Sequence, residues 1–433
     1  MKFLLEILVL SLCALILIFK GRKRTAIYLI STFFIPDTFG TAHIILPLSY
    51  IISMYIRKEL SEQIKQFPLR KISIAILIIY FLISIFDDRL SVIETFTRPI
   101  IYFIKTYLFL FVGFCLINNN RQRIYAFKVL LIILSIYAIY GIFTWIISRN
   151  PWYDGVAKIY LSGEGMWADV QERGYRVNSF LSNPIAYGLI MGIGSLSLWL
   201  FRKEHSKKIN TIFLGIIIFN VLLSNSRTSI IAFGIGIILF LVLYLGISLK
   251  MISTFILLYI ILFTLYINVE SIQSMINPVI DMFITGGNNT QGSNVELKND
   301  QLATSLLYFY DSPFFGHGIN YFRENIQERY GMLSGLAGLE GYGYRILVEL
   351  GVFMLIAFII YIINFIRVTV SYYKQNKMIA SILISQFIAF IFFIIATGDY
   401  GGVFEYCFII IGLNLKWLIS KSTSQLTDIK YKS

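Results

Sequence analysis

The chain has 433 residues, of which 57% are hydrophobic and only 14% are charged. Soluble domains carry about 25% charged residues, so this composition excludes a soluble globular protein and predicts an all-α, polytopic integral membrane protein. The net charge of +13 does not indicate nucleic-acid binding, because the basic residues lie in short clusters between apolar segments.

Thirteen apolar segments follow one another along the chain. They lie at 3–19, 25–36, 42–56, 72–86, 100–117, 124–147, 181–200, 209–223, 229–249, 251–268, 345–366, 378–396 and 404–419. The second and third are short, and Pro36, Gly40 and Pro47 fall within or between them, which is typical of a bent hairpin or a re-entrant pair. The predicted number of membrane spans is therefore about 12 or 13, within a single domain of residues 1–433.

Basic residues are concentrated in every second connection between these segments. They lie at 20–24, 57–71, 121–128, 202–208, 250, 367–377 and in the tail 416–432. Because basic connections stay in the cytoplasm, the remaining connections are predicted to face outside. Those are 37–41, 87–99, 149–178, 224–228, 269–344 and 397–402, and the N-terminus is outside too if all thirteen segments cross.

Two of the outward connections are long. Residues 149–178 are rich in glycine and aromatic residues, and residues 269–344 form the largest soluble segment, in which acidic residues outnumber basic ones. Within the larger loop, a Gly/Asn-rich linker at 286–293 precedes a predicted amphipathic helix at 299–310 and a turn at 311–316. Long ordered loops usually carry function, so the second half of this loop is a candidate functional region.

Three arginines lie on the predicted outward face, against the charge bias. Arg173 and Arg176 precede one apolar segment, and Arg227 lies in a tight turn between two others. An arginine at the centre of a membrane helix costs about 2.5–3.5 kcal/mol, so one near a membrane face has either a structural partner or a ligand. A guanidinium binds phosphate with two hydrogen bonds, and the natural anion at this depth is a lipid pyrophosphate.

Other reactive residue types give no site. The three cysteines lie inside apolar segments and the three histidines are scattered, so neither set predicts disulfides or a metal centre.

Four local patterns resemble the O-antigen polymerase/ligase family of bacterial envelope glycosyltransferases. In chain order they are RVNSFLSNPIA at 176–186, LSNSRT at 223–228, DSPFFGHG at 311–318 and YRILVELG at 344–351. The resemblance covers roughly residues 170–355, and the N-terminal third matches only as generic membrane helices.

The resemblance implies a transferase with no metal or cofactor, whose active site faces the outer side of the bacterial inner membrane. The implied donor is an oligosaccharide on undecaprenyl pyrophosphate, and a chain-length regulator protein is a further implied partner. Arg176 and Arg227 match the two outward arginines with which the family holds the donor pyrophosphate, and they would stabilise the leaving diphosphate.

One departure from the family bears on the reaction. Ligases carry a histidine about nine residues before a Glu-x-Gly, and the corresponding residue here is Glu340. This favours a polymerase, in which Glu340 is a candidate general base, although a solvated loop acid is an equal alternative. Further expected substrate contacts are Arg173, Arg323, Arg345, His317 and Asn183, with a structural role favoured for His317. For Arg345, the position at a helix start disfavours a cation, which suggests that a ligand retains it.

The favoured function is therefore a polymerase of O-antigen, capsular or exopolysaccharide repeat units. Two alternatives stay open: an O-antigen ligase that transfers glycan to lipid A core, and a flippase or exporter of lipid-linked oligosaccharides. A transporter more often carries ionisable residues at mid-membrane, and the predicted helix centres hold few.

Overall fold

The computed structural model describes residues 2–160, 175–204, 208–247, 249–268, 270–289, 294–322, 340–399 and 402–430, and every regular element in these ranges is a helix. The first half comprises α1 (Lys2–Ile18), α2 (Gly21–Phe34), α3 (Ala42–Ile56), α4 (Leu60–Gln66), α5 (Arg70–Ile85), α6 (Val92–Phe103), the π-helical η1 (Ile104–Leu108), α7 (Phe109–Cys115), α8 (Asn120–Ile147), α9 (Pro151–Tyr160) and α10 (Pro184–Glu204). The second half comprises α11 (Lys208–Leu223), α12 (Arg227–Leu245), α13 (Leu249–Asn268), α14 (Glu270–Ile284), α15 (Val295–Asp311), α17 (Tyr342–Arg345), the π-helical η3 (Ile346–Leu350), α18 (Gly351–Ser371), α19 (Lys377–Thr397) and α20 (Val403–Lys430).

The all-α, polytopic prediction is confirmed. Each of the thirteen apolar segments forms a helix or part of one. Within the described ranges, seven helical stretches are long and apolar enough to cross a membrane, or eight if α4 and α5, bent by 100°, count as one span. Helices α1, α3 and α11 are apolar but have only 17, 15 and 16 residues, so length alone supports fewer spans than predicted.

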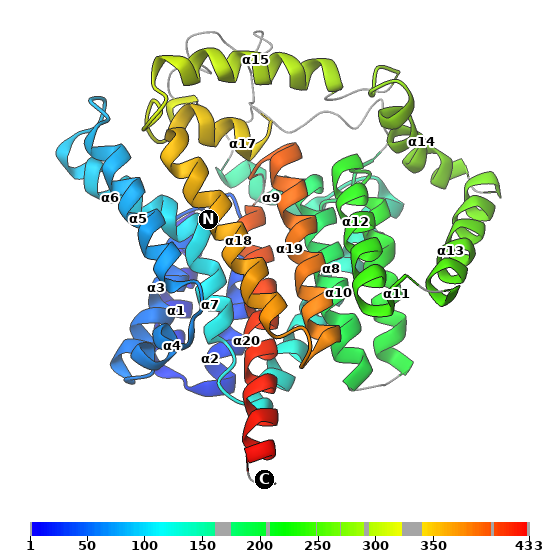
Figure 1. The fold of residues 1–433 in the computed structure, drawn as a ribbon, viewed down its shortest axis with the longest axis horizontal. Helices are drawn as coiled ribbons and strands as arrows, with labels where there is room; N and C mark the ends of the chain where they lie inside the picture. Colours follow the sequence, from blue (N-terminus) through cyan, green and yellow to red (C-terminus); the bar gives the residue numbers. More distant parts are fainter. Residues whose placement is uncertain are drawn as a thin grey trace.

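The basic connections at 20–24 and 57–71 and the C-terminal helix lie together at one end of the bundle. Arg57 donates a hydrogen bond to the carbonyl of Leu17 at 2.7 Å. Leu17 lies at the end of α1, just before the first basic connection, so this bond joins the second basic connection to the first. Lys416 donates to Gln63 Oε1 at 2.9 Å, which brings the C-terminal helix onto α4. In Figure 1, α4 and the C-terminus accordingly lie in the lower part of the molecule.

The connections without basic clusters meet at the opposite end. The Asp37 carboxylate accepts a hydrogen bond from the Ser182 backbone N–H at 3.2 Å, and Asn150 Nδ2 donates to Asn178 Oδ1 at 2.6 Å. Figure 1 shows α9, α15 and α17 in the upper part of the molecule, away from the C-terminus. The predicted alternation of connections therefore corresponds to two distinct ends, whereas the side of the membrane that each end faces stays a prediction.

Close helix packing and buried amides form the scaffold beneath the upper end. A Cβ atom on Gly113 of α7 would lie 2.5 Å from the Ile409 carbonyl of α20, so only glycine allows this helix pair to approach so closely. Gln386 of α19 donates to Ser197 of α10 at 2.7 Å and accepts from Asn414 of α20 at 2.8 Å. These contacts fix the relative positions of α10, α19 and α20.

Candidate functional site

Arg227 is the first residue of α12 and lies at the upper end of the bundle. The preceding Ser226 caps this helix, with its Oγ accepting a hydrogen bond from the Ser229 backbone N–H at 3.3 Å. The half-buried guanidinium reaches the turn after α14, where a Cβ on Gly287 would lie 3.0 Å from Arg227 Nη1. The adjacent Gly286 carbonyl accepts from the Val295 N–H at 3.0 Å, so Arg227 lies beside the segment that starts α15.

Arg176 is held next to the turn between α11 and α12 by its neighbour in the chain. The Val177 backbone N–H donates to the Leu223 carbonyl at 3.1 Å, and Leu223 is the last residue of α11. Ser229 Oγ also donates to the Ile185 carbonyl at 2.6 Å, which ties the start of α12 to the start of α10. The structure thus brings the backbone of the first two sequence patterns together at one end of the bundle. Arg173 lies outside the described residues.

Glu340 faces a lysine that the sequence did not single out. Lys298 Nζ lies 3.7 Å from Glu340 Oε2, and the two side chains are 23% and 28% exposed. Lys298 Nζ also donates to the Ala396 carbonyl at the end of α19, and the Glu340 backbone N–H donates to Gln301 Oε1 at 3.2 Å. In the sequence, Lys298 is only one of a few basic residues in an acidic loop, so no pattern distinguishes it.

Electrostatics link Lys298 to Arg227 as well. Burial lowers the pKa of Lys298, and the positive charge of Arg227 lowers it further, while the Glu340 carboxylate acts in the opposite direction. Because Arg227 adjoins the turn before α15 and Lys298 in that helix faces Glu340, we group the three residues as the Arg227–Lys298–Glu340 cluster. Two cations and one carboxylate leave it with a net positive charge, which suits an anionic ligand.

Helix α15 turns a polar face toward the bundle. Gln301 and Ser305 are 1% and 0% exposed and follow Lys298 at helical spacing, whereas Leu307 and Tyr310 on the other side are 68% and 74% exposed. Figure 1 shows α15 lying across the upper end of the bundle. The predicted helix at 299–310 is therefore confirmed, and its polar side adjoins the cluster.

Arg345 lies between two carboxylates. Its Nη1 forms an ion pair with Asp399 in the α19–α20 connection, and its Nη2 lies 3.6 Å from Glu349 Oε2. The Glu349 side chain is only 3% exposed. Arg345 therefore has two protein partners at this helix start, and its predicted contact with substrate stays a prediction.

The third and fourth sequence patterns pack backbone to backbone. A Cβ on Gly316 would lie 2.4 Å from the Glu349 carbonyl carbon, and one on Gly351 would lie 2.4 Å from the Phe314 oxygen. Both glycines have positive φ, at +68°. The DSPFFGHG turn therefore lies directly on η3 and the start of α18.

His317 fills a structural position in this turn. Its backbone N–H donates to the Val348 carbonyl at 2.8 Å, and its Nε2 lies 2.8 Å from the Tyr308 carbonyl oxygen of α15. The ring stacks on Tyr321 with 4.5 Å between ring centroids. These contacts join the turn to α15, and the predicted contact of His317 with substrate stays a prediction.

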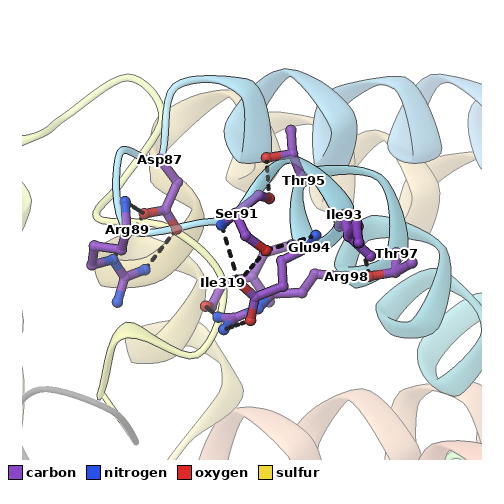
Figure 2. Close-up of polar contacts among 9 residues, drawn as sticks. All are labelled: Asp87, Arg89, Ser91, Ile93, Glu94, Thr95, Thr97, Arg98 and Ile319. Atoms are coloured by element: carbon purple, nitrogen blue, oxygen red, sulfur yellow. Dashed lines mark hydrogen bonds and ion pairs between the residues drawn. The ribbon is translucent and has the colours of Figure 1, made fainter.

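The start of α6 supports the same turn from another side. Figure 2 shows Ser91 and Glu94 in a reciprocal capping box, with the Ser91 N–H donating to Glu94 Oε2 at 3.0 Å. Arg98, one turn further along, pairs with Glu94 at 2.9 Å and donates to the Ile319 carbonyl at 3.4 Å.

The connection between α5 and α6 makes a second contact with the turn. Asp87 accepts two hydrogen bonds from the Arg89 guanidinium, at 2.8 and 2.7 Å (Figure 2). A Cβ on Gly318 would lie only 1.9 Å from Asp87 Oδ2, so the carboxylate packs against the glycine itself. The N-terminal third thus supports the site, although the sequence indicated only generic helices there.

Asn183 occupies a helix-capping position. Its Oδ1 accepts a hydrogen bond from the Ile185 N–H at 2.7 Å, and Pro184 follows as the first residue of α10. The cap accounts for the asparagine without a ligand, and its predicted contact with substrate stays a prediction.

Replacing Asn183 by alanine is expected to destabilise the protein by about 1 kcal/mol, because the Ile185 N–H loses its partner. Asn183→Ser, which supplies another capping oxygen, should retain most of that stability. Thermal unfolding of the purified variants in detergent measures both effects. Unchanged stability in Asn183→Ala, with weaker binding of donor, would instead support the substrate contact.

Two remaining predictions concern Arg323 and metal ions. Arg323 lies outside the described residues. In the part of the chain that the structure describes, no group of three or more His, Cys, Asp or Glu side chains is placed to hold a metal ion.

Comparison with known protein families bears directly on this region. Residues 212–359 match the model of the family described as O-antigen ligase. The matched region contains Arg227, Lys298, Glu340 and Arg345, whereas Arg176 precedes it. No curated protein matches the chain. The family match confirms the resemblance seen in the sequence and supports a membrane enzyme of the O-antigen polymerase or ligase type that acts on lipid-linked oligosaccharides.

Proposed function

Because residues 212–359 match the model of the O-antigen ligase family, we propose that the protein is a polymerase of lipid-linked oligosaccharide repeat units. The observation that carries the proposal is the meeting of the first two sequence patterns, through the Val177–Leu223 hydrogen bond of 3.1 Å. This contact supports a site in which Arg176 and Arg227, from the same end of the bundle, together hold a membrane-bound diphosphate.

In the proposed reaction, Arg176 and Arg227 bind the diphosphate of the donor. The bond between the anomeric carbon and the diphosphate oxygen breaks, and a hydroxyl of the acceptor sugar forms the new bond to that carbon. The acceptor proton passes to Glu340, and undecaprenyl diphosphate leaves with the bonding electron pair. The guanidinium groups offset the charge that grows on the leaving diphosphate, so the proposed reaction uses no metal ion.

The proposed active site faces the outer side of the bacterial inner membrane. The basic connections lie at the end of the bundle opposite to Arg227, and basic connections stay in the cytoplasm. Labelling of a single cysteine introduced beside Gly287 with a membrane-impermeant reagent tests this side. Reaction only after the membrane is opened would reverse the orientation.

A reconstituted reaction tests the proposed function directly. Purified protein in lipid nanodiscs, supplied only with repeat units on undecaprenyl diphosphate, is expected to produce a ladder of longer glycans on a gel. Transfer to lipid A core in place of a ladder would identify a ligase, and the absence of either product would overturn the enzyme proposal.

The ligase is the second candidate, because the matched family is described as O-antigen ligase. Deletion of the gene separates the two in cells that make O-antigen. A polymerase mutant keeps core with one repeat unit, whereas a ligase mutant displays none. An exporter, the third reading, would leave repeat units on the cytoplasmic leaflet.

Replacing Glu340 by glutamine is expected to slow polymerisation by about 10²-fold, at the low end of the range for general bases. The lower end applies because an oxocarbenium-like transition state places most charge on the sugar and the leaving group. Single-turnover rates measure the effect. Asp154→Asn serves as the matched control, because it alters another carboxylate that is paired with a basic side chain, Arg149, at 2.6 Å. An unchanged rate in Glu340→Gln would remove its role as base.

A further inference from the structure

The reaction proposed above uses Arg176, Arg227 and Glu340 and gives Lys298 no part. Lys298 nevertheless lies between the donor and acceptor sides of the proposed site. It stands in the first turn of α15, whose preceding turn is contacted by Arg227 at Gly287, and its ammonium faces Glu340.

The contacts of the ammonium leave it able to exchange partners. One N–H of Lys298 donates to the Ala396 carbonyl, which anchors the side chain at the end of α19. The Glu340 carboxylate lies 3.7 Å from Nζ, which is an ion-pair distance but longer than a hydrogen bond. An ammonium has three N–H groups, so donors remain for an oxyanion that approaches from the Arg227 side.

Charge decides which partner the ammonium prefers. Arg227 adjoins the turn at Gly287 that leads into α15, and Lys298 stands in the first turn of that helix, so a diphosphate bound at Arg227 also acts on Lys298. A diphosphate carries more negative charge than one carboxylate and attracts the ammonium more strongly at equal distance. Lysine binds phosphate as a point charge and needs no fixed geometry to do so.

We propose that Lys298 is a positioning residue that couples the two halves of the site. In the empty site, its ammonium restrains the Glu340 carboxylate as an ion pair. When the donor diphosphate binds at Arg227, the ammonium moves to the phosphate oxygens and leaves the carboxylate able to take the acceptor proton. The inference rests on the proposed function, because it uses the same diphosphate and the same base. It adds an order of events in which the base becomes available only after the donor has bound.

Binding of undecaprenyl diphosphate without any glycan tests the coupling apart from catalysis. The affinity is measured for the purified full chain in nanodiscs, with Lys298→Met, Glu340→Gln and the double variant. Lys298→Met is expected to weaken binding about tenfold, since one charge-assisted contact is lost. Glu340→Gln is expected to tighten binding about threefold or more, because the ammonium no longer has a competing carboxylate.

The double variant decides the inference. With Lys298 already replaced, Glu340→Gln is expected to leave the affinity unchanged, because the carboxylate acts through the lysine. Equal tightening in both backgrounds would mean that Glu340 only repels the diphosphate, and would overturn the coupling. No effect of Glu340→Gln in either background would overturn it as well. If the unmodified protein fails to bind, or Arg227→Ala binds equally well, the proposed function fails instead.

Two controls keep the result interpretable. Lys298→Gln is a second neutral variant that still offers a donor to the Ala396 carbonyl, and it should reproduce the affinity changes of Lys298→Met should the latter fold poorly. Arg149→Met and Asp154→Asn remove the two charges of a 2.6 Å ion pair after α8, in which the arginine side chain is 70% exposed. Neither is expected to change the affinity for undecaprenyl diphosphate.

Discussion

Replacing Arg227 by alanine is expected to lower the rate of polymerisation by about 10³-fold. In other enzymes, loss of an arginine that stabilises the charge developing on a phosphate group has an effect of this size. The fold should persist. The α12 cap depends on Ser226, not on the arginine side chain, and a cation at a helix N-terminus is unfavourable to the helix dipole. The effect should therefore appear in catalysis and not in stability.

Single-turnover rates with lipid-linked repeat units measure the loss, and thermal unfolding of the same preparations checks the fold. Arg227→Lys keeps the charge but not the two parallel donors, so an intermediate rate is expected. Arg176→Ala should resemble Arg227→Ala, and the double variant should lose less than the product of the two effects, because both groups act on one diphosphate. Normal long chains in cells carrying either alanine variant would refute the assignment.

The sequence predicted those features of the fold that depend on local periodicity and charge. Each apolar segment forms a helix, the connections with and without basic clusters separate into two ends, and the loop helix appears as α15. The turn before Arg227 was also predicted correctly, since Ser224 and Asn225 interrupt two apolar segments. Each of these signals lies within a window of a few residues.

The partners of the charged groups could not be predicted in this way. Arg345 and Asp399 are 54 positions apart in the chain, and Lys298 reaches Ala396 across 98 positions. Such pairs form only when packing places α15, α17 and the end of α19 together, and no periodic pattern in the sequence records that. The role of Asp87 could not be predicted for the same reason, because its carboxylate contacts Gly318 from a helix pair that is far away in the chain.

Replacing Arg345 by methionine is expected to destabilise the fold by about 3 kcal/mol or more, because two carboxylates lose their common cation. Glu349 bears most of this cost, since its side chain is 3% exposed and cannot be hydrated where it lies. It also accepts a hydrogen bond from the Phe322 N–H at 3.3 Å, so the loss should extend to the segment that follows the DSPFFGHG turn. Unfolding in mixed micelles measures the change.

A compensating variant separates this structural role from the substrate contact predicted for Arg345. Neutralising both acids, with Glu349→Gln and Asp399→Asn added to Arg345→Met, should restore much of the stability, because no buried charge is then left alone. If the restored protein binds undecaprenyl diphosphate as the unmodified protein does, Arg345 serves the fold. If stability returns but binding stays weak, the guanidinium contacts the donor in addition to its two carboxylates, and the outward cations then include a third member of the diphosphate site.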